Sequence, residues 1–325
     1  MTATLTLEPL GGITPHPRAN DHTAGATYDL RPTAARNPGG AVDWARTHGA
    51  ALRDRLRTDG MILLRGLPVD IAAFDDVVRA VGGELLPYTE RSTPRSAVKG
   101  NIYTSTEYPS DQSIPLHNES SYAAAWPTTV YFFCHTAPGT GGATPVADSR
   151  AVLDLIPQAV RARFADGVLY TRTFRAEMGL SWQEAYQTDD RAAVERHCRA
   201  HGHAYSWDGD VLHTRHHRPA TLTDPATGTE VWFNQGHLFH ISNLEPDLRD
   251  VLVETYGDHG LPRNAHLANG SPIPDDDLTA IRSAYADASL ALPWQQGDIM
   301  LVNNHLMAHG REPFTGDRRI LVAMT

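Results

Sequence analysis

Cysteine is scarce in this sequence, and its scarcity excludes two kinds of scaffold. Only Cys134 and Cys198 occur among 325 residues, which is too few for a disulfide framework and too few for a structural zinc site. A reducing compartment is therefore expected. Apolar runs long enough to cross a bilayer are also missing, so the sequence predicts no contact with a membrane.

Positive charge is sparse as well. Lysine and arginine number 28 against 38 aspartates and glutamates, a formal net charge of −10, and no run of basic residues offsets this balance. A nucleic-acid-binding surface is therefore not expected, and a small molecule is the expected partner. The amino-terminal segment MTATLTLEPLGGITPHPRAND lacks the basic start and apolar centre of a secretory signal, so we expect a soluble cytoplasmic protein.

The chain divides into a short arm and one large domain. Residues 1–40 are rich in Pro, Gly, Thr and Ala without a sustained period, and they are expected to form an extended arm. Residues 41–325 are expected to form a single domain. Apolar spacing near its start predicts helices over 42–56 and 70–81, separated by a buried strand at 61–67.

The rest of the domain is dominated by predicted strands. Short β-branched or aromatic runs bounded by turn residues predict strands at 129–136, 167–174, 211–217, 230–235, 298–304 and 318–324. Helical insertions are predicted at 149–165, 181–200, 245–256 and 275–288. Ser181 and Glu184 form a capping-box signature in the second of these. The pattern predicts a mainly β fold with helical insertions (α+β), built on a jelly-roll core with helices packed on one face.

A histidine and a glutamate lie two positions apart in the segment PLHNESS (115–121). In a strand, His117 and Glu119 point to the same side and Asn118 to the other. An imidazole and a carboxylate side by side can be two ligands of one divalent metal, completed by a third from elsewhere. Chance alone gives about two such pairs in a chain of this composition, so the pair by itself leaves both interpretations open.

The segment NNHLMAHGREPFTGDRRILVAM (303–324) offers His305 and His309 as a third ligand. His309 is favoured because Arg311 follows closely, and Arg318 and Arg319 open the last predicted strand. A guanidinium near a metal suits a dicarboxylate co-substrate, since its planar fork binds a carboxylate through two hydrogen bonds and stays charged when buried.

These residues resemble the taurine dioxygenase (TauD/TfdA) family of Fe(II)- and 2-oxoglutarate-dependent oxygenases, from about residue 60 to the carboxyl terminus. The resemblance implies a double-stranded β-helix (jelly-roll) core and an iron site formed by His117, Glu119 and His309. It also implies that Thr144, in the segment GGAT, and Arg319, in the segment RRI, bind the distal carboxylate of 2-oxoglutarate.

The resemblance further implies Fe(II), 2-oxoglutarate and O2 as cofactor and co-substrates. Oxidative decarboxylation would yield succinate, CO2 and a ferryl species that abstracts hydrogen from an unactivated C–H bond, with hydroxylation as the commonest outcome. Desaturation and cyclisation remain open. Halogenation requires the carboxylate ligand to be missing, and Glu119 is present. A protein on the same fold that binds a metal or small molecule without turnover is the alternative from another class.

The stretches around the motifs look most like the SyrP-like branch, whose members modify amino acids or related molecules in natural-product pathways. The substrate is therefore expected to be an amino acid or a derivative, either free or tethered to a carrier protein, and the oligomeric state, including a homo-oligomer, stays open. Asn118, Asn234 and His237 are the candidates for the substrate pocket. The cluster of His213, His216 and His217 matches no family motif, and we expect it to be structural or on the surface.

Overall fold

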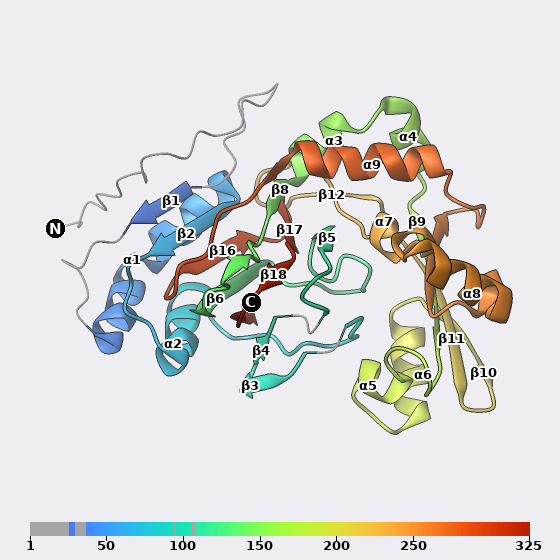
Figure 1. Cartoon of the computed structure of the whole chain (residues 1–325), viewed down its shortest axis with the longest axis horizontal. Helices are drawn as coiled ribbons and strands as arrows, with labels where there is room; N and C mark the ends of the chain where they lie inside the picture. The colour runs from blue at the N-terminus through green and yellow to red at the C-terminus, as the bar shows by residue number, and fades with distance from the viewer. Residues whose placement is uncertain (1–25, 30–36, 94, 106–107) are drawn as a thin grey trace.

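The computed structural model describes residues 26–29, 37–93, 95–105 and 108–325. Within them the architecture is mixed α/β, with several β-sheets and helices around them (Figure 1). Most of the expected arm, residues 1–40, lies outside the described residues. The part that is described includes β1 (Ala26–Asp29), which pairs in parallel with β2 (Met61–Arg65).

Two amino-terminal helices cover one face of the largest sheet. Helix α1 (Pro38–Asp59) begins after Asn37, whose side chain accepts a hydrogen bond from the Gly40 amide, and it ends at Gly60, where φ is 73°. Helix α2 (Ile71–Gly82) begins after Asp70, which caps it in the same way. Both caps satisfy amide groups that a helix leaves unpaired at its start. The helices and the strand predicted for this region are confirmed.

The largest sheet has seven strands in the order β1-β2-β16-β6-β19-β4-β3. The strands not yet given are β3 (Ala97–Lys99), β4 (Ile102–Thr104), β6 (Thr129–Thr136), β16 (Ile299–Asn303) and β19 (Arg319–Met324). Both faces are buried. Leu321 and Ala323 pack in the core cluster under α1 and α2, whereas Ile320 and Val322 pack in the cluster on the other side. Because strand side chains alternate, β19 contributes to two separate cores.

A second sheet lies against that inner face and contains four strands in the order β15-β8-β17-β5. Their bounds are β5 (Ile114–His117), β8 (Val146–Asp148), β15 (Ser289–Leu290) and β17 (Met307–Arg311). Val146 of β8 and Met307 of β17 share the core cluster of Ile320 and Val322. The predictions included no strand over 307–311, because the polar run there lacks strand alternation.

A third sheet and several helices form the other end of the molecule (Figure 1). The sheet order is β10-β11-β9-β14, with β9 (Val168–Phe174), β10 (Ala204–Asp208), β11 (Val211–Arg218) and β14 (Arg263–Leu267). The helices are α3 (Ser149–Leu155), α4 (Gln158–Arg163), α5 (Trp182–Tyr186), α6 (Arg191–Ala200), α7 (Gly236–Phe239), α8 (Pro246–Tyr256) and α9 (Asp275–Asp287). Two-stranded pairs join β12 (Thr221–Thr223) to β13 (Glu230–Trp232) and β7 (Thr140–Gly141) to β18 (Phe314–Thr315). None of the helices in the described ranges is long and apolar enough to cross a membrane.

Two of the predicted helices are interrupted. The helix expected over 149–165 is broken between α3 and α4 at Pro157, which precedes α4 and cannot continue the α3 ladder. The helix expected over 181–200 divides into α5 and α6. The capping box of Ser181 and Glu184 is present at the start of α5, as predicted.

Candidate active site

The three predicted metal ligands lie where two neighbouring strands meet. β5 runs antiparallel to β17, and His117 pairs directly with His309 in this register. The two imidazole rings are 4.7 Å apart between their centroids. Glu119 follows β5 in the next turn, and ligand atoms of the three side chains lie within 4.8 Å of one another. The structure thus brings together residues that are almost 200 positions apart in the sequence.

Gly310 allows the two strands to approach closely. A Cβ atom at this position would lie 2.7 Å from the carbonyl oxygen of Ile114 and 3.3 Å from the amide nitrogen of Leu116. The first distance is shorter than a carbon and an oxygen tolerate without a shift of the backbone. A glycine next to His309 is therefore needed for the spacing of β5 and β17.

The backbone selects one tautomer of His117. The Nδ1 atom lies 2.8 Å from the carbonyl oxygen of Pro115. This oxygen can only accept, so Nδ1 donates its proton and Nε2 keeps its lone pair. Burial first, and the neighbouring His309 second, lower the pKa of His117 from 6.5 to about 4. The ring is consequently neutral near pH 7, which is the form that binds a metal.

Glu119 is held by a buried arginine that the sequence analysis did not identify. Nη2 of Arg95 donates to both carboxylate oxygens, at 3.1 Å and 2.9 Å, and Nε2 of His309 lies 3.5 Å from Oε2. Burial alone would raise the pKa of Glu119, but Arg95 and His309 together hold it well below its usual value. The carboxylate is therefore ionised at neutral pH. Arg95 stands in a loop without periodicity, so no pattern in the sequence pointed to it.

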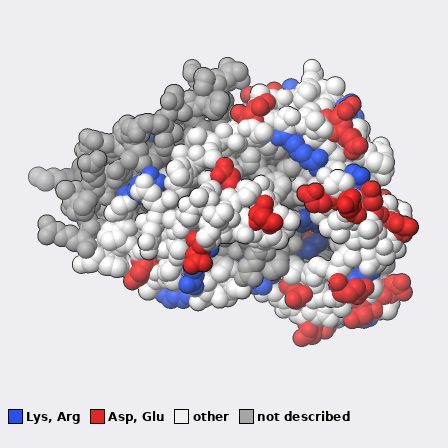
Figure 2. Space-filling model, viewed as in Figure 1, with Lys and Arg blue, Asp and Glu red and all other residues white. Residues whose placement is uncertain are grey.

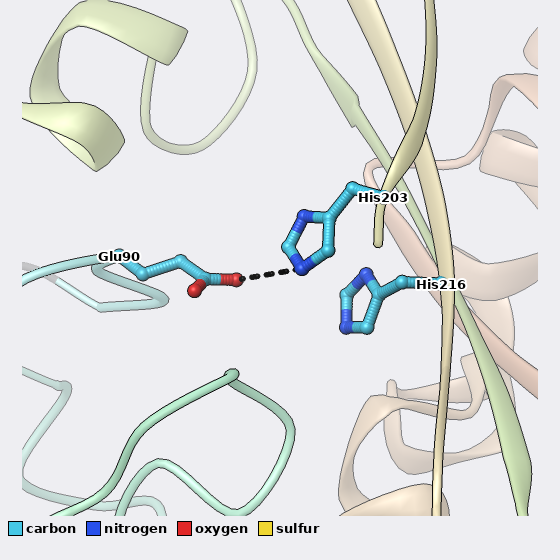
Figure 3. Close-up of side chains that lie close together, drawn as sticks. All are labelled: Glu90, His203 and His216. Atoms are coloured by element: carbon cyan, nitrogen blue, oxygen red, sulfur yellow. Dashed lines mark ion pairs between the residues drawn. The ribbon is translucent and has the colours of Figure 1, made fainter. Parts of the chain in front are cut away.

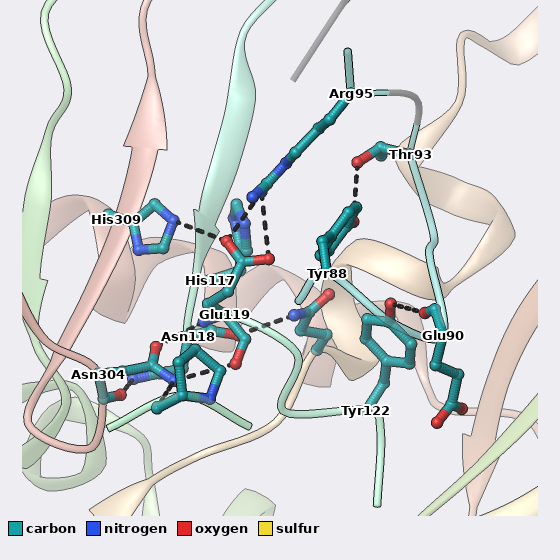
Figure 4. Close-up of polar contacts among 12 residues, drawn as sticks. Tyr88, Glu90, Thr93, Arg95, His117, Asn118, Glu119, Tyr122, Asn304 and His309 are labelled. Atoms are coloured by element: carbon teal, nitrogen blue, oxygen red, sulfur yellow. Dashed lines mark hydrogen bonds and ion pairs between the residues drawn. The ribbon is translucent and has the colours of Figure 1, made fainter. Parts of the chain in front are cut away.

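Asn304 ties the segment that carries Glu119 to the start of β17 (Figure 4). Its Oδ1 accepts from the Glu119 amide at 2.6 Å, and its Nδ2 donates to the carbonyl oxygens of Glu119 and Pro127. Asn118 in turn donates to the Asn304 carbonyl at 2.7 Å and to Ser149 at 3.1 Å. These bonds connect the chain segments that provide the ligands, so the carboxylate and the imidazoles are positioned by one network.

A small cavity lies on one side of the three candidate ligands, and its wall includes His117, His309, Thr144 and Arg318. Arg318 donates to the Thr144 hydroxyl at 3.3 Å, to the Gly142 carbonyl at 2.9 Å and to the Ser105 hydroxyl at 3.3 Å. Burial first, and Arg311 second, lower the pKa of Arg318 to about 10. The guanidinium therefore stays charged at neutral pH.

The expected position of Arg319 in this site is wrong. Arg319 is exposed, and Arg318 lies beside Thr144 in its place. The two residues do point to opposite sides, as strand alternation requires. Arg318 shares the side of Ile320 and Val322, which face the inner core, and a register irregularity after Arg319 marks the start of β19.

A larger cavity lies on the other side of the candidate ligands. It shares Arg95, Ile114 and His117 with the smaller one. Its wall also includes Glu119 and Arg263, together with tyrosines and small hydroxyl side chains. Figure 2 shows a hollow on the viewed face, right of centre, with basic side chains inside it and acidic ones along part of its rim. A cavity therefore lies on each side of the candidate ligands.

The three residues expected in the substrate pocket do not line either cavity. Asn118 takes part in the Asn304 network. Asn234 donates to the Ala220 carbonyl and accepts from the Gly236 amide, and His237 is hydrogen-bonded to the Leu116 carbonyl at 2.9 Å. All three are buried and serve the backbone, so these assignments are corrected.

The residue that does reach the cavity is Gln235, the immediate neighbour of Asn234. The side-chain amide nitrogen of Gln235 donates to the Asn118 carbonyl at 2.8 Å. The strand predicted over 230–235 ends at Trp232, and α7 begins at Gly236. Asn234 and Gln235 therefore lie outside the strand, and strand alternation does not say which of the two faces the cavity.

The donor set fits a divalent iron ion. Two imidazoles and one carboxylate on one side of an ion form the facial triad that leaves the remaining positions open. The hydrogen bond from His117 to a backbone carbonyl is the outer support typical of metal-bound histidines. His309 adds a buried Nδ1 without a hydrogen-bond partner among the described residues. His117, Glu119 and His309 are therefore the residues that could hold iron.

A second group of candidate ligands is formed by Glu90, His203 and His216 (Figure 3). The geometry of this group favours a structural role over a metal site. Nη2 of Arg218 lies 2.8 Å from Nε2 of His203, so a cation already occupies that lone pair. The rings of His203 and His216 are stacked at 4.0 Å, and the Glu90 carbonyl accepts from the Tyr122 hydroxyl at 2.6 Å. The group is bonded to Tyr122, which lines the larger cavity, through the Glu90 carbonyl and through Nε2 of His216.

Comparisons with known proteins agree with this geometry. The model of the family described as taurine catabolism dioxygenase TauD, TfdA family matches residues 27–325. The dapdiamide synthesis protein DdaC of Enterobacter agglomerans is 37% identical over 310 residues, which are 92% of this chain and 94% of that protein. A clavaminate synthase-like protein of Arabidopsis thaliana is 30% identical over 292 residues, 86% of this chain and 85% of the other.

Solved structures share the fold. PvcB from Pseudomonas aeruginosa superposes with a TM-score of 0.57 at 17% identity, covering 100% of this chain and 94% of PvcB. A second structure of PvcB, described as an Fe, alpha-ketoglutarate dependent oxygenase from an isonitrile synthetic pathway, gives a TM-score of 0.53 at 16% identity and covers 93% and 85% of the two chains.

Proposed function

Because the chain belongs to the TauD/TfdA family of dioxygenases and is therefore an oxidoreductase, we propose that it hydroxylates an unactivated C–H bond of an amino acid or an amino-acid-derived small molecule. The proposed reaction depends on non-haem Fe(II) and consumes 2-oxoglutarate and O2. The observation that carries the proposal is the position of His117, Glu119 and His309, which converge between two cavities.

The three residues would hold the iron through Nε2 of His117, the carboxylate of Glu119 and an imidazole nitrogen of His309. The iron and 2-oxoglutarate would together supply the oxidising chemistry, in which O2 gives one oxygen atom to succinate and the other to the substrate as CO2 is released. The chain's own contribution is orientation. Asn304 fixes the backbone of Glu119, and the Pro115 carbonyl fixes the ring of His117.

We assign the binding of 2-oxoglutarate to the smaller cavity. Arg318 and Thr144 would bind its distal carboxylate, because a charged guanidinium and a hydroxyl group lie side by side there. The end of 2-oxoglutarate opposite this distal carboxylate would face the iron. In this assignment Arg318 takes the role that the sequence had suggested for Arg319.

The larger cavity is left for the substrate, and the relatives support a biosynthetic role. DdaC is a dapdiamide synthesis protein, and PvcB comes from an isonitrile synthetic pathway. A pathway that builds a specialised small molecule is therefore the proposed setting. We also infer that the seven-stranded and four-stranded sheets are the two halves of a double-stranded β-helix, within one domain of residues 41–325.

The test combines co-substrate consumption with a substrate screen. Protein is loaded with Fe(II) and 2-oxoglutarate without oxygen, exposed to oxygen, and assayed for succinate in the presence of amino acids and their derivatives. We expect at least one compound to raise succinate release above the uncoupled background and to gain 16 mass units. Wild-type protein that binds iron but forms no succinate, with or without added compounds, would contradict the proposal.

A further inference from the structure

Arg263 is a basic residue inside the larger cavity that the proposed reaction does not yet use. It opens β14 and lines the same cavity as His117 and Glu119. It is partly buried, and its guanidinium lies 5.3 Å from the centre of the Phe239 ring. Its position is set by a regular strand, because β14 pairs with β9 along its whole length.

No described residue accepts a hydrogen bond from the Arg263 side chain or forms an ion pair with it. Most other arginines near the site have such partners. Arg95 is bonded to Glu119, Arg311 donates to backbone carbonyls, and Arg318 donates to Thr144. Burial, followed by the charge of Arg172, lowers the pKa of Arg263. Apart from the contact with the Phe239 ring, the described residues therefore give this cation neither a hydrogen-bond acceptor nor a counter-ion.

The charges around Arg263 add to the unbalanced positive charge at this position. Arg172 is its direct cross-strand partner, and like charges opposite each other on adjacent strands repel. Arg172 has the Glu90 carboxylate as a counter-charge. Among the described residues that line the cavity, Glu119 is the only acid, and Arg95 already binds both of its oxygens. Among the described residues of the cavity, the positive charge of Arg263 therefore has no matching negative charge.

Apart from Arg263 itself and from Arg95, His117 and Glu119, the other described residues of the wall are uncharged, and they include polar side chains as well as the apolar Ile114, Pro115 and Leu238. Hydroxyl groups come from tyrosines, serines and a threonine, and amide groups from Gln235 and Asn243. Such a wall supplies hydrogen bonds but no negative charge. A charge that is partly removed from water and has no counter-ion is costly, and an anionic partner from outside would offset that cost at Arg263. A carboxylate matches the planar fork of a guanidinium through two parallel hydrogen bonds.

We propose that Arg263 is the anchor for a free carboxylate of the substrate. The inference rests on the proposed function and narrows its substrate class to organic acids, such as amino acids or N-acylated amino acids with an unmodified carboxylate. The carboxylate is held at β14, and the rest of the molecule extends past the tyrosines toward His117 and Glu119. A compound whose only carboxylate is tied up in a thioester or an amide lacks the anchoring group.

This anchor is separate from the one proposed for 2-oxoglutarate. Arg318 and Thr144 line the smaller cavity, and Arg263 lines only the larger one. The two cavities meet at Arg95, Ile114 and His117. A change at Arg263 therefore affects the two ligands differently, and this difference is the basis of the test.

The probes are the twenty standard L-amino acids, their N-acetyl forms and the C-terminal amides of both sets. Binding to protein saturated with Fe(II) and 2-oxoglutarate under nitrogen is screened by the shift in melting temperature, and hits are titrated by calorimetry. We expect wild-type protein to bind at least one carboxylate about thirty-fold or more tightly than its amide, a ratio of the size expected for a charge-assisted contact. Arg263→Gln should remove most of that preference.

Two further variants sharpen the result. Arg263→Lys keeps the positive charge but not the planar guanidinium, so we expect it to lose part of the preference for the carboxylate over its amide. This variant provides the test if Arg263→Gln does not fold. Arg319→Gln removes an exposed arginine and should bind like wild type. The inference is overturned if wild type prefers no carboxylate over its amide, if Arg263→Gln or Arg263→Lys keeps the full preference, or if Arg263→Gln loses affinity for 2-oxoglutarate instead.

The proposed function can fail independently. If wild type prefers carboxylates through Arg263 but consumes no 2-oxoglutarate in the presence of oxygen and any of the bound compounds, the oxygenase assignment is wrong and the anchor stands. If the enzyme oxidises a compound without a carboxylate as fast as its acid counterpart, the oxygenase assignment stands and the anchor is wrong.

Discussion

A single nitrogen of Arg95 lies within hydrogen-bond distance of both carboxylate oxygens of Glu119, and both side chains are buried. The same guanidinium stacks over the ring of Tyr88, with its carbon 4.5 Å from the ring centre. Its Nε and Nη1 atoms have no hydrogen-bond partner among the described residues. Arg95 is therefore a neutralising charge for a candidate metal ligand and also part of the wall of both cavities.

Loss of Arg95 should destabilise the metal-free protein strongly. Arg95→Met leaves the ionised Glu119 buried without a counter-charge, which typically costs about 3–5 kcal/mol. Adding Glu119→Gln should recover much of this loss, because a neutral amide is cheaper to bury than a lone carboxylate. Urea unfolding of wild type, both single variants and the double variant, all in the presence of chelator, measures the coupling energy. We expect at least about 1 kcal/mol, and strictly additive changes would contradict a direct interaction.

Removal of the carboxylate ligand should abolish coupled oxidation. Glu119→Ala deletes one of three protein ligands, and the remaining two imidazoles hold iron poorly. We expect a loss of at least ten-fold to a hundred-fold in Fe(II) affinity, since even outer-shell changes at metal sites have effects of about this size. Anaerobic titration with Fe(II) and an assay for succinate check this expectation. Glu177→Ala removes an exposed glutamate and is the control. Near wild-type hydroxylation by Glu119→Ala would rule out the proposed ligand set.

The two adjacent arginines at the start of β19 should differ sharply in their effect on 2-oxoglutarate. Arg318→Ala removes a guanidinium next to Thr144 and should cost roughly 2–5 kcal/mol in binding, or about thirty-fold to several-thousand-fold in affinity. Arg319→Ala removes an exposed side chain and should leave the affinity nearly unchanged. Titration of the iron-loaded variants without oxygen separates them. Equal losses, or a larger loss at Arg319, would place the co-substrate elsewhere.

His237 should act on stability through pH. Burial first lowers its pKa from 6.5 to about 3, so the folded protein keeps the ring neutral while the unfolded chain binds a proton. The unfolded state then holds more protons between pH 6.5 and 3, and the free energy of unfolding falls as the pH falls through this window. The slope is at most about 1.4 kcal/mol per pH unit for one such group.

His237→Gln removes this titration, so its free energy of unfolding should depend less steeply on pH between 6 and 5 than that of wild type. Urea unfolding at pH 7, 6 and 5 measures the slopes, and His259→Gln, which removes an exposed ring, is the control. Affinity for any substrate found in the screen should not change. An unaltered slope in His237→Gln would mean that the ring is not buried as the structure has it.

The spacing of residues in the sequence was sufficient to single out side chains that converge in the structure, but not to orient their neighbours. His117 and Glu119 were identified because strand alternation places them together, although β5 ends at His117 and a turn completes the arrangement. Asn118 was mistaken for a pocket residue because alternation says which side chains share a face, and not what lies on each side. Here the opposite side holds Ser149 and Asn304.

The choice between Arg318 and Arg319 shows a different limit. Ile320 to Met324 are apolar without interruption, because both faces of β19 are buried, so hydrophobic alternation cannot show which face is inward. Only the packing of two separate cores makes the distinction. Arg95 and Arg263 were missed for a third reason. Each is distant from the ligands in sequence, and an arginine in a loop or at the start of a strand looks like an ordinary surface residue until the chain has folded.

The close approach at Gly310 makes the site vulnerable to a change that alters no ligand. One added methyl group would press on the backbone of β5 and separate His117 from His309, although every side chain that binds the metal would still be present. A lineage that no longer needed the activity could lose it by this route first. Surveys that classify related sequences by the two histidines and the acid alone would then count an inactive chain as an oxygenase, and the residue after the distal histidine is the one to inspect.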